Sequence, residues 1–112
     1  MKPLLPTLKE KKRYIGFSVI AKSKLPEKAI SKAILSGMKA YLGDYGMASA
    51  GANLLKVSEG KAIVRVNIPY VNHMKAAMSL IDKIESSEVI IKSESVSGTL
   101  KQLKKKLYGE AS

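Results

Sequence analysis

Hydrophobic and polar residues alternate most regularly between residues 61 and 68, in a segment that a proline ends. Val64 and Val66 alternate there with Arg65 and Asn67. This period of two is typical of a strand with one buried and one polar face. Arg65 is one of only two arginines among twenty basic residues, and the alternation predicts that it points away from the core.

Three further segments have the composition of strands, at 14–20, 47–57 and 88–96. The first and last alternate in the same way, with β-branched and aromatic residues on the face that we expect to be buried. The middle one is weakly patterned, and a glycine at position 51 predicts a bulge in it. With the segment described above, the chain is expected to form four strands.

Helices are expected at 27–42 and 70–84, where apolar residues recur at spacings of three and four. Gly43 follows the first helix and is a plausible C-terminal stop. A short basic helix is expected at 100–107, with Thr99 in the position of an N-cap.

The order strand, helix, strand, strand, helix, strand, helix predicts an α+β protein with a ferredoxin-like or RNA-recognition-like sandwich. Right-handed crossovers then give a four-stranded antiparallel sheet in the order 4-1-3-2, with two helices on one face and an extra C-terminal helix. The other face is expected to be open, or covered in part by a protein or by the C-terminal helix. We expect one such domain over 14–112, preceded by a basic arm over 1–13.

Positive charge is concentrated near the two ends of the chain. The net charge is +11, of which residues 1–24 contribute +6 and residues 97–108 contribute +4, whereas residues 25–96 contribute only +2. Basic ends on a nearly neutral body predict a polyanionic partner such as RNA. A membrane surface is not expected as a partner, because no basic segment also carries a broad apolar face with aromatic residues. A spanning helix is not expected either, because no apolar run approaches the ~20 residues that span a bilayer.

The expected sheet order brings these two basic ends together. The start of the first strand and the ends of the third and fourth strands lie at the same edge of such a sheet. The basic residues up to Arg13, the side chain of Asn67, and residues 97–99 with the helix that follows them therefore form one basic pole. Helix N-termini also begin at this edge, and their free N–H groups suit phosphate.

The open face carries few aromatic residues. RNA-recognition folds stack bases on rings placed on the first and third strands, but the third strand here has Ile63 and Arg65 on that face. Tyr14 is the aromatic residue available, as a stacking residue or as an ordinary tyrosine at the edge of the sheet. Ile63 and Ile90 on an open face predict an interface with a partner.

The sequence gives no sign of a catalytic or metal site. It has no cysteine and a single histidine, and its nine acidic residues are scattered rather than paired. We therefore expect no catalytic residue, no metal ligand and no cofactor bound by the polypeptide. The absence of cysteine also fits a reducing cytoplasm.

Four motifs, in this order and spacing, resemble a known family. They are the segments 7–15 (TLKEKKRYI), 43–48 (GDYGMA), 60–66 (GKAIVRV) and 89–99, with its ends VIIK and VSGT. They closely resemble the protein component 2 family of archaeal ribonuclease P, which is homologous to a small subunit of eukaryotic ribonucleases P and MRP. One departure is Val66, where the family often has cysteine.

This resemblance implies a function that the pattern alone does not reach. It implies a subunit of ribonuclease P, the endoribonuclease that removes the 5′ leader from precursor tRNA, with catalysis by the RNA subunit and its magnesium ions. It also implies pairing with protein component 3 in a heterotetramer, self-association as a homodimer, and contact with other holoenzyme proteins and precursor tRNA.

Two other functions stay open on the residues alone. One is a non-catalytic ferredoxin-like module that regulates or assembles by binding a protein or metabolite, and the other is binding of a different structured RNA. The residues expected to contact RNA are Lys9, Lys11, Lys12, Arg13, Tyr14, Arg65, Asn67, Lys92, Ser97, Thr99, Lys101, Lys104 and Lys105.

Overall fold

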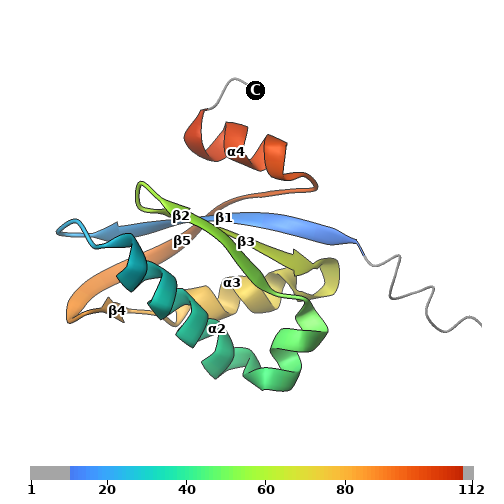
Figure 1. Ribbon diagram of the computed structural model, residues 1–112, viewed down its shortest axis with the longest axis horizontal. Coiled ribbons are helices and arrows are strands. Elements are labelled where there is room, and N and C mark those ends of the chain that lie inside the picture. The colour runs from blue at the N-terminus through green and yellow to red at the C-terminus, as the bar shows by residue number, and fades with distance from the viewer. Residues whose placement is uncertain (1–10, 110–112) are drawn as a thin grey trace, which may run out of the picture.

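Strand β1 (Lys12–Ala21) lies at the centre of a five-stranded antiparallel sheet in the computed structural model, which describes residues 11–109. Its neighbours are β3 (Lys61–Asn67) on one side and β5 (Ser87–Ser97) on the other. Strands β2 (Asn53–Ser58) and β4 (Lys83–Ile84) form the two edges, so the order is β2-β3-β1-β5-β4 (Figure 1). The expectation of an α+β fold with an antiparallel sheet is confirmed.

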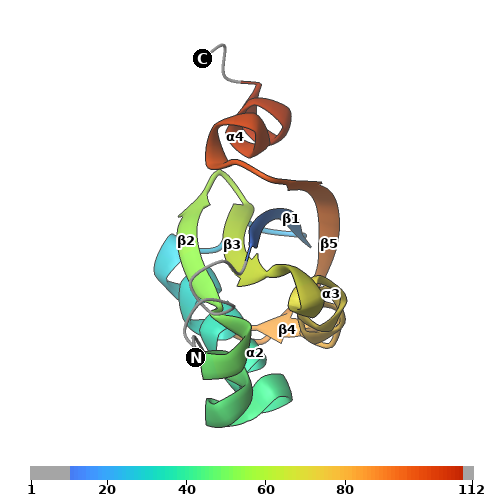
Figure 2. The same ribbon diagram turned by 90° about the vertical axis from the view of Figure 1, so that its right-hand side faces the viewer.

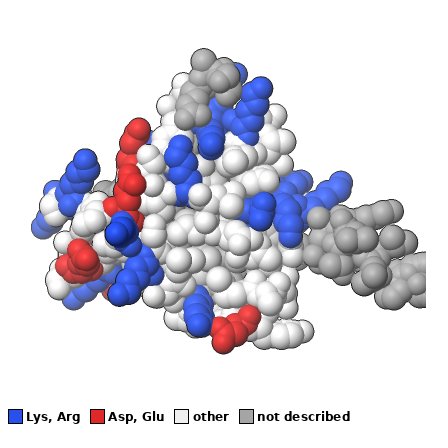
Figure 3. Space-filling model, in the orientation of Figure 1, with Lys and Arg blue, Asp and Glu red and all other residues white. Residues whose placement is uncertain are grey.

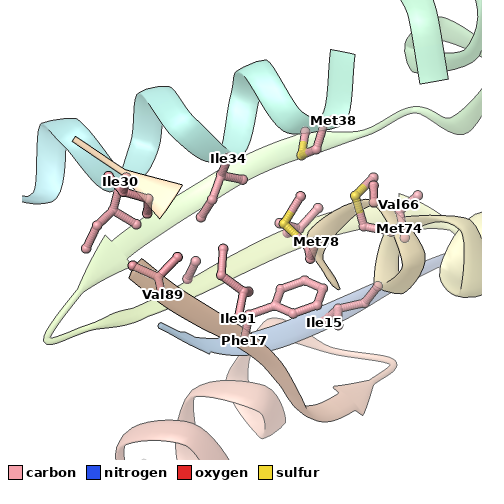
Figure 4. Close-up of a cluster of buried hydrophobic side chains, with 14 of the residues drawn as sticks. Ile15, Phe17, Ile30, Ile34, Met38, Val66, Met74, Met78, Val89 and Ile91 are labelled. Carbon is pink, nitrogen blue, oxygen red and sulfur yellow. The ribbon is translucent and has the colours of Figure 1, made fainter. Parts of the chain in front are cut away.

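One face of the sheet is covered by two helices, α2 (Glu27–Ala50) and α3 (Val71–Ser79). The alternation along β1 sends Ile15 and Phe17 to this face, where both are buried. They pack in one cluster with apolar side chains of both helices, including Ile34 (Figure 4). Burial of each such side chain stabilises the fold by roughly 1.5–3 kcal/mol. Most buried apolar residues belong to this cluster, so the main core lies between the sheet and these two helices.

The opposite face is covered by helix α4 (Leu100–Tyr108), as the view in Figure 2 shows. Leu103 and Leu107 of α4 form a small buried cluster with Ile63 of β3. Gly16 makes this contact feasible, because a Cβ atom there would lie 2.9 Å from Cδ1 of Leu107. Of the alternatives expected for this face, the structure thus shows partial coverage by the C-terminal helix.

The second strand begins later than the sequence predicts, because helix α2 does not end before Gly43. Gly43 is non-helical, with φ 75° and ψ 172°, but the chain resumes the helix and continues to Ala50. Gly51, in the left-handed region with φ 58°, then caps the helix. The glycine-rich segment after residue 42 is thus a kinked helix, and the expectation of a strand over 47–57 is wrong in its first half.

The second helix was expected over 70–84, but α3 ends at Ser79. A single 3₁₀ turn (Ile68–Tyr70) precedes it, and Ile84 lies instead in the short strand β4. Ile84 is buried against the same core as the helices, which explains why its position fitted a helical spacing. Because β4 adds a fifth strand, the four-stranded sheet with order 4-1-3-2 is not confirmed.

Candidate nucleic-acid interface

The basic pole is the edge of the sheet where β1 begins and β3 and β5 end. Lys12 pairs with Asn67 in the β1–β3 ladder, and Tyr14 pairs with Ser97 in the β1–β5 ladder. The backbone N–H of Ile68 also donates to the carbonyl oxygen of Lys11, at 3.1 Å. Residues 11–13 are therefore held on the sheet, and β1 begins inside the segment that we expected to be an arm.

Asn67 is part of the pole but is buried within it, at 3% exposure. Its Oδ1 accepts a hydrogen bond from Nζ of Lys12 at 2.5 Å, and its Nδ2 donates to the carbonyl oxygen of Ser49 at 3.0 Å. The expectation that Asn67 donates to RNA does not fit this burial, because both ends of its amide already bind within the chain.

Ser97 and Thr99 lie where β5 turns into helix α4. Ser97 is buried and its Oγ donates to Oε1 of Gln102 at 3.1 Å, so its hydroxyl hydrogen is already used. Thr99 is the N-cap of α4, and its Oγ1 accepts from the backbone N–H of Gln102 at 3.2 Å. Thr99 is exposed and keeps its own hydroxyl hydrogen for a ligand.

Helix α4 begins at the pole and runs back over the sheet towards the β2–β3 turn (Figure 1). At its far end the hydroxyl of Tyr108 donates to the carbonyl oxygen of Ser58 at 3.3 Å. Nζ of Lys56 also lies over the Tyr108 ring, 4.7 Å from its centroid. Because α4 begins at the pole, Lys101 is its lysine nearest the pole, and Lys104 and Lys105 lie further along the helix.

Arg65 and Tyr14 are partners on the face that α4 covers. Arg65 is half-buried, and its Nε is buried without a hydrogen-bond partner within residues 11–109. Tyr14 is half-buried and packs against the cluster of Ile63 and Leu103. Its ring is thus engaged by α4, which leaves little of it for stacking on a base.

Three of the expected site residues lie away from the pole, and a fourth is outside the described part of the chain. Lys92 pairs with Ser18, nearer the other end of the sheet. Ile63 is fully buried in a cluster with Leu103 and Leu107 of α4, so the C-terminal helix covers it rather than a partner protein. Ile90 is 65% exposed at the far end of β1 and β5, and Lys9 lies outside the described residues.

The charges of the described residues are unevenly distributed. Figure 3 shows basic side chains over the start of β1 and around α4, and basic and acidic side chains side by side at the other end of the sheet. Most acidic residues of residues 11–109 lie on the loops and strand ends of that far end: Glu27, Glu59, Asp82, Glu85 and Glu88. Among residues 11–109, the pole is thus a region of positive charge with few acidic residues nearby.

The part of the chain that the structure describes shows neither a metal site nor a membrane-spanning helix. Residues 11–109 contain no group of three or more acidic, histidine or cysteine side chains that could hold a metal ion. Within the same residues, no helix combines the length and hydrophobicity needed to cross a membrane.

Gln102 and Gly51 contribute to the pole but were not identified from the sequence. Gln102 follows Thr99 at the spacing of a capping box, a signal that could have identified it. Gly51 lies against Lys12 and Asn67, which are distant in sequence, and no local pattern indicates that contact.

The fold and the pole define a class of protein: a small basic α+β sandwich whose charge suits a polyanion. The chain belongs to the Rpp14/Pop5 family, whose profile matches residues 13–108. It is 37% identical to "Ribonuclease P protein component 2" of Thermococcus kodakarensis over 97% of this chain and 92% of the relative. It is 33% identical to the protein of the same name from Archaeoglobus fulgidus, over 95% and 96% of the two chains.

A solved structure shares the fold. A chain of the yeast ribonuclease MRP structure, determined by cryo-electron microscopy, superposes with a TM-score of 0.63 at 15% identity, covering 81% of this chain and 76% of the other. At this identity the likeness supports the fold alone.

Proposed function

We propose that this protein is a subunit of ribonuclease P, which binds the RNA of that ribonucleoprotein through the basic pole during removal of the 5′ leader from precursor tRNA. Family membership over residues 13–108 supports the assignment to the complex. The observation that supports the pole as the RNA site is the pairing of Lys12 with Asn67 and of Tyr14 with Ser97, which joins the two basic ends of the sequence.

In this proposal the protein contributes cations and shape, and catalysis belongs to the RNA with its magnesium ions. Lys11, Lys12 and Arg13 neutralise phosphates beside the start of α4, whose first backbone N–H groups have no partner within the helix. Arg65 adds a cation on the face of the sheet that α4 covers, opposite Tyr14 in the β1–β3 ladder. The holoenzyme is an endoribonuclease, and the polypeptide acts on the RNA fold rather than on the scissile phosphate.

Protein partners belong at the other end of the sheet. Ile20 and Ile90 are paired neighbours there and are 51% and 65% exposed. Exposed apolar residues in contact with each other favour a protein–protein interface. We assign to this surface the pairing with component 3, in a cytoplasmic complex that also includes a second copy of the chain.

A pull-down with the full-length protein tests the proposal. The expected result is recovery of one abundant structured RNA together with cleavage of precursor tRNA at the 5′ leader. If about five phosphates are neutralised, the affinity for an archaeal ribonuclease P RNA transcript should fall with salt at a log–log slope on the order of −4. Recovery of no RNA would favour a regulatory module. An affinity that does not change with salt would mean that the pole is not the RNA site.

A further inference from the structure

Asn67 joins three segments that are distant in sequence. Its Oδ1 binds Lys12 at the start of β1, and its Nδ2 binds the carbonyl oxygen of Ser49 in the last turn of α2. Asn67 itself ends β3. An amide that is 97% buried and bonded at both ends is costly to move, because each broken bond leaves a buried polar atom without a partner.

Gly51 provides the space for this arrangement. A Cβ atom at position 51 would lie 3.0 Å from Nζ of Lys12 and 3.1 Å from Oδ1 of Asn67. The ammonium group of Lys12 therefore lies close against the backbone of the α2–β2 connection. Its position is defined from two sides, by the amide of Asn67 and by the backbone at Gly51.

Lys12 keeps donors for a ligand in this position. An ammonium group has three N–H donors, and Asn67 takes one of them. A free lysine loses side-chain entropy when it binds a phosphate, whereas a lysine that is already held loses less. The contact with Asn67 thus prepares Lys12 for a phosphate without cancelling its charge.

We infer that Asn67 is a positioning residue of the RNA-binding pole, which acts by holding the ammonium group of Lys12 where it meets an RNA phosphate. This inference rests on the proposed function. It replaces the expectation that Asn67 donates to RNA directly, and it makes Lys12 the residue through which Asn67 affects binding.

The test measures binding of the full-length protein to an archaeal ribonuclease P RNA transcript over a series of salt concentrations. Asn67→Ala should weaken binding roughly 2- to 10-fold, the effect of having to order one lysine on binding. Its salt slope should stay unchanged, because no charge is lost. Lys12→Ala should lower the slope by about 0.7–0.9, the loss of one phosphate contact.

The double variant separates positioning from a general structural effect. On the Lys12→Ala background, Asn67→Ala should weaken RNA binding no further, because its effect passes through the ammonium group. Ser23→Ala is the control, since Ser23 is an exposed polar residue in the loop after β1, at the far end of the sheet. It should leave binding unchanged.

A second variant keeps the shape of the side chain in case Asn67→Ala does not fold. Asn67→Asp puts a carboxylate against Lys12 and neutralises it, so its salt slope should fall as in Lys12→Ala. Ser23→Asp adds the same charge at an exposed site at the far end of the sheet and should leave the slope nearly unchanged.

The outcomes distinguish this inference from the proposed function. If the wild-type protein does not bind the transcript, the proposed function fails. If Lys12→Ala weakens binding but Asn67→Ala and Asn67→Asp do not, only the inference is wrong. It is also wrong if Asn67→Ala has its full effect on the Lys12→Ala background.

Discussion

The two ends of the sheet carry the same kind of cation in different surroundings. At the pole, Lys12 and Arg13 belong to β1 and lie beside the end of β3. At the far end, Lys22 and Lys83 line the same recess as Asp82 and Glu88. Cations beside carboxylates are locally compensated, whereas no ion pair involves Lys12 or Arg13 among the described residues.

This difference shows that the proposed RNA site depends on the arrangement of charge rather than on the net charge of +11. The far end also exposes Ile20 and Ile90, at 51% and 65%, whereas Ile68 at the pole is exposed to only 37%. One end of the sheet is thus suited to phosphates and the other to a protein. Each experiment below compares a change at the pole or under α4 with a matched change elsewhere.

The largest effect is expected from removal of the three cations at the start of β1. Each phosphate contact contributes about 5-fold to affinity near physiological salt, so Lys11→Ala, Lys12→Ala and Arg13→Ala together should weaken RNA binding on the order of 100-fold. Filter binding to an archaeal ribonuclease P RNA transcript measures this loss. Folding should be retained, which circular dichroism and thermal unfolding can verify.

The charge-matched control is a triple alanine variant at Lys22, Lys24 and Lys83, all exposed at the far end. It removes the same charge and should weaken binding less than about 5-fold in total. Equal losses in the two triple variants would mean that RNA responds to net charge alone, and the distinction between the two ends would then be lost.

The sequence predicted the pole because the evidence for it is local. Alternation in β1, β3 and β5 defines the strands, and the strand order then brings the two basic ends together. Family resemblance supplied the function, which charge and periodicity alone left open between RNA binding and a regulatory module. The contacts within the pole could not be predicted, because Asn67, Lys12 and Gly51 meet only in three dimensions.

The errors have physical causes of the same kind. Gly43 has the φ of a helix stop, yet the chain resumes the helix because Ala50 is buried in the core. Ile84 fits a helical spacing and a strand equally well, and packing decides between them. For Ile63, exposure on the pattern alone left two covers open, a partner or the C-terminal helix, and the packing of Leu103 and Leu107 against it decides for the helix.

The next largest effect is expected from Leu103→Ala, which weakens the contact of α4 with the sheet. Leu103 is fully buried and anchors the helix that carries Lys101. With α4 no longer held, its lysines and its N-terminus must be ordered on binding, so affinity for the transcript should fall on the order of 10-fold. Titrations below the unfolding temperature measure this loss on folded protein.

Ile34→Ala is the control for that variant, because it removes a buried side chain from the opposite face of the sheet. It should destabilise the protein by about 2–5 kcal/mol and leave the RNA affinity of the folded protein unchanged. If both variants weaken binding equally, the effect reports stability, and α4 has no separate part in the RNA site.

A smaller effect is expected at Arg65. Arg65→Ala should weaken RNA binding about 5-fold, as one lost phosphate contact. Arg65→Lys keeps the charge but loses the planar fork of the guanidinium group, so it should recover only part of the affinity. The affinities of both variants for the transcript test this prediction. If neither substitution changes the affinity, Arg65 does not contact the RNA.

The smallest effect on RNA binding is expected at the far end, and it is the most specific test of the difference between the ends. Ile20→Ser with Ile90→Ser should change the affinity for the transcript less than 2-fold, since neither side chain lies near the pole. Because both side chains are largely exposed, the free energy of unfolding should change by less than about 0.5 kcal/mol for each. The same variant should lose binding to component 3 in a pull-down with purified proteins. Weak RNA binding with intact binding to component 3 would reverse the roles that we assign to the two ends.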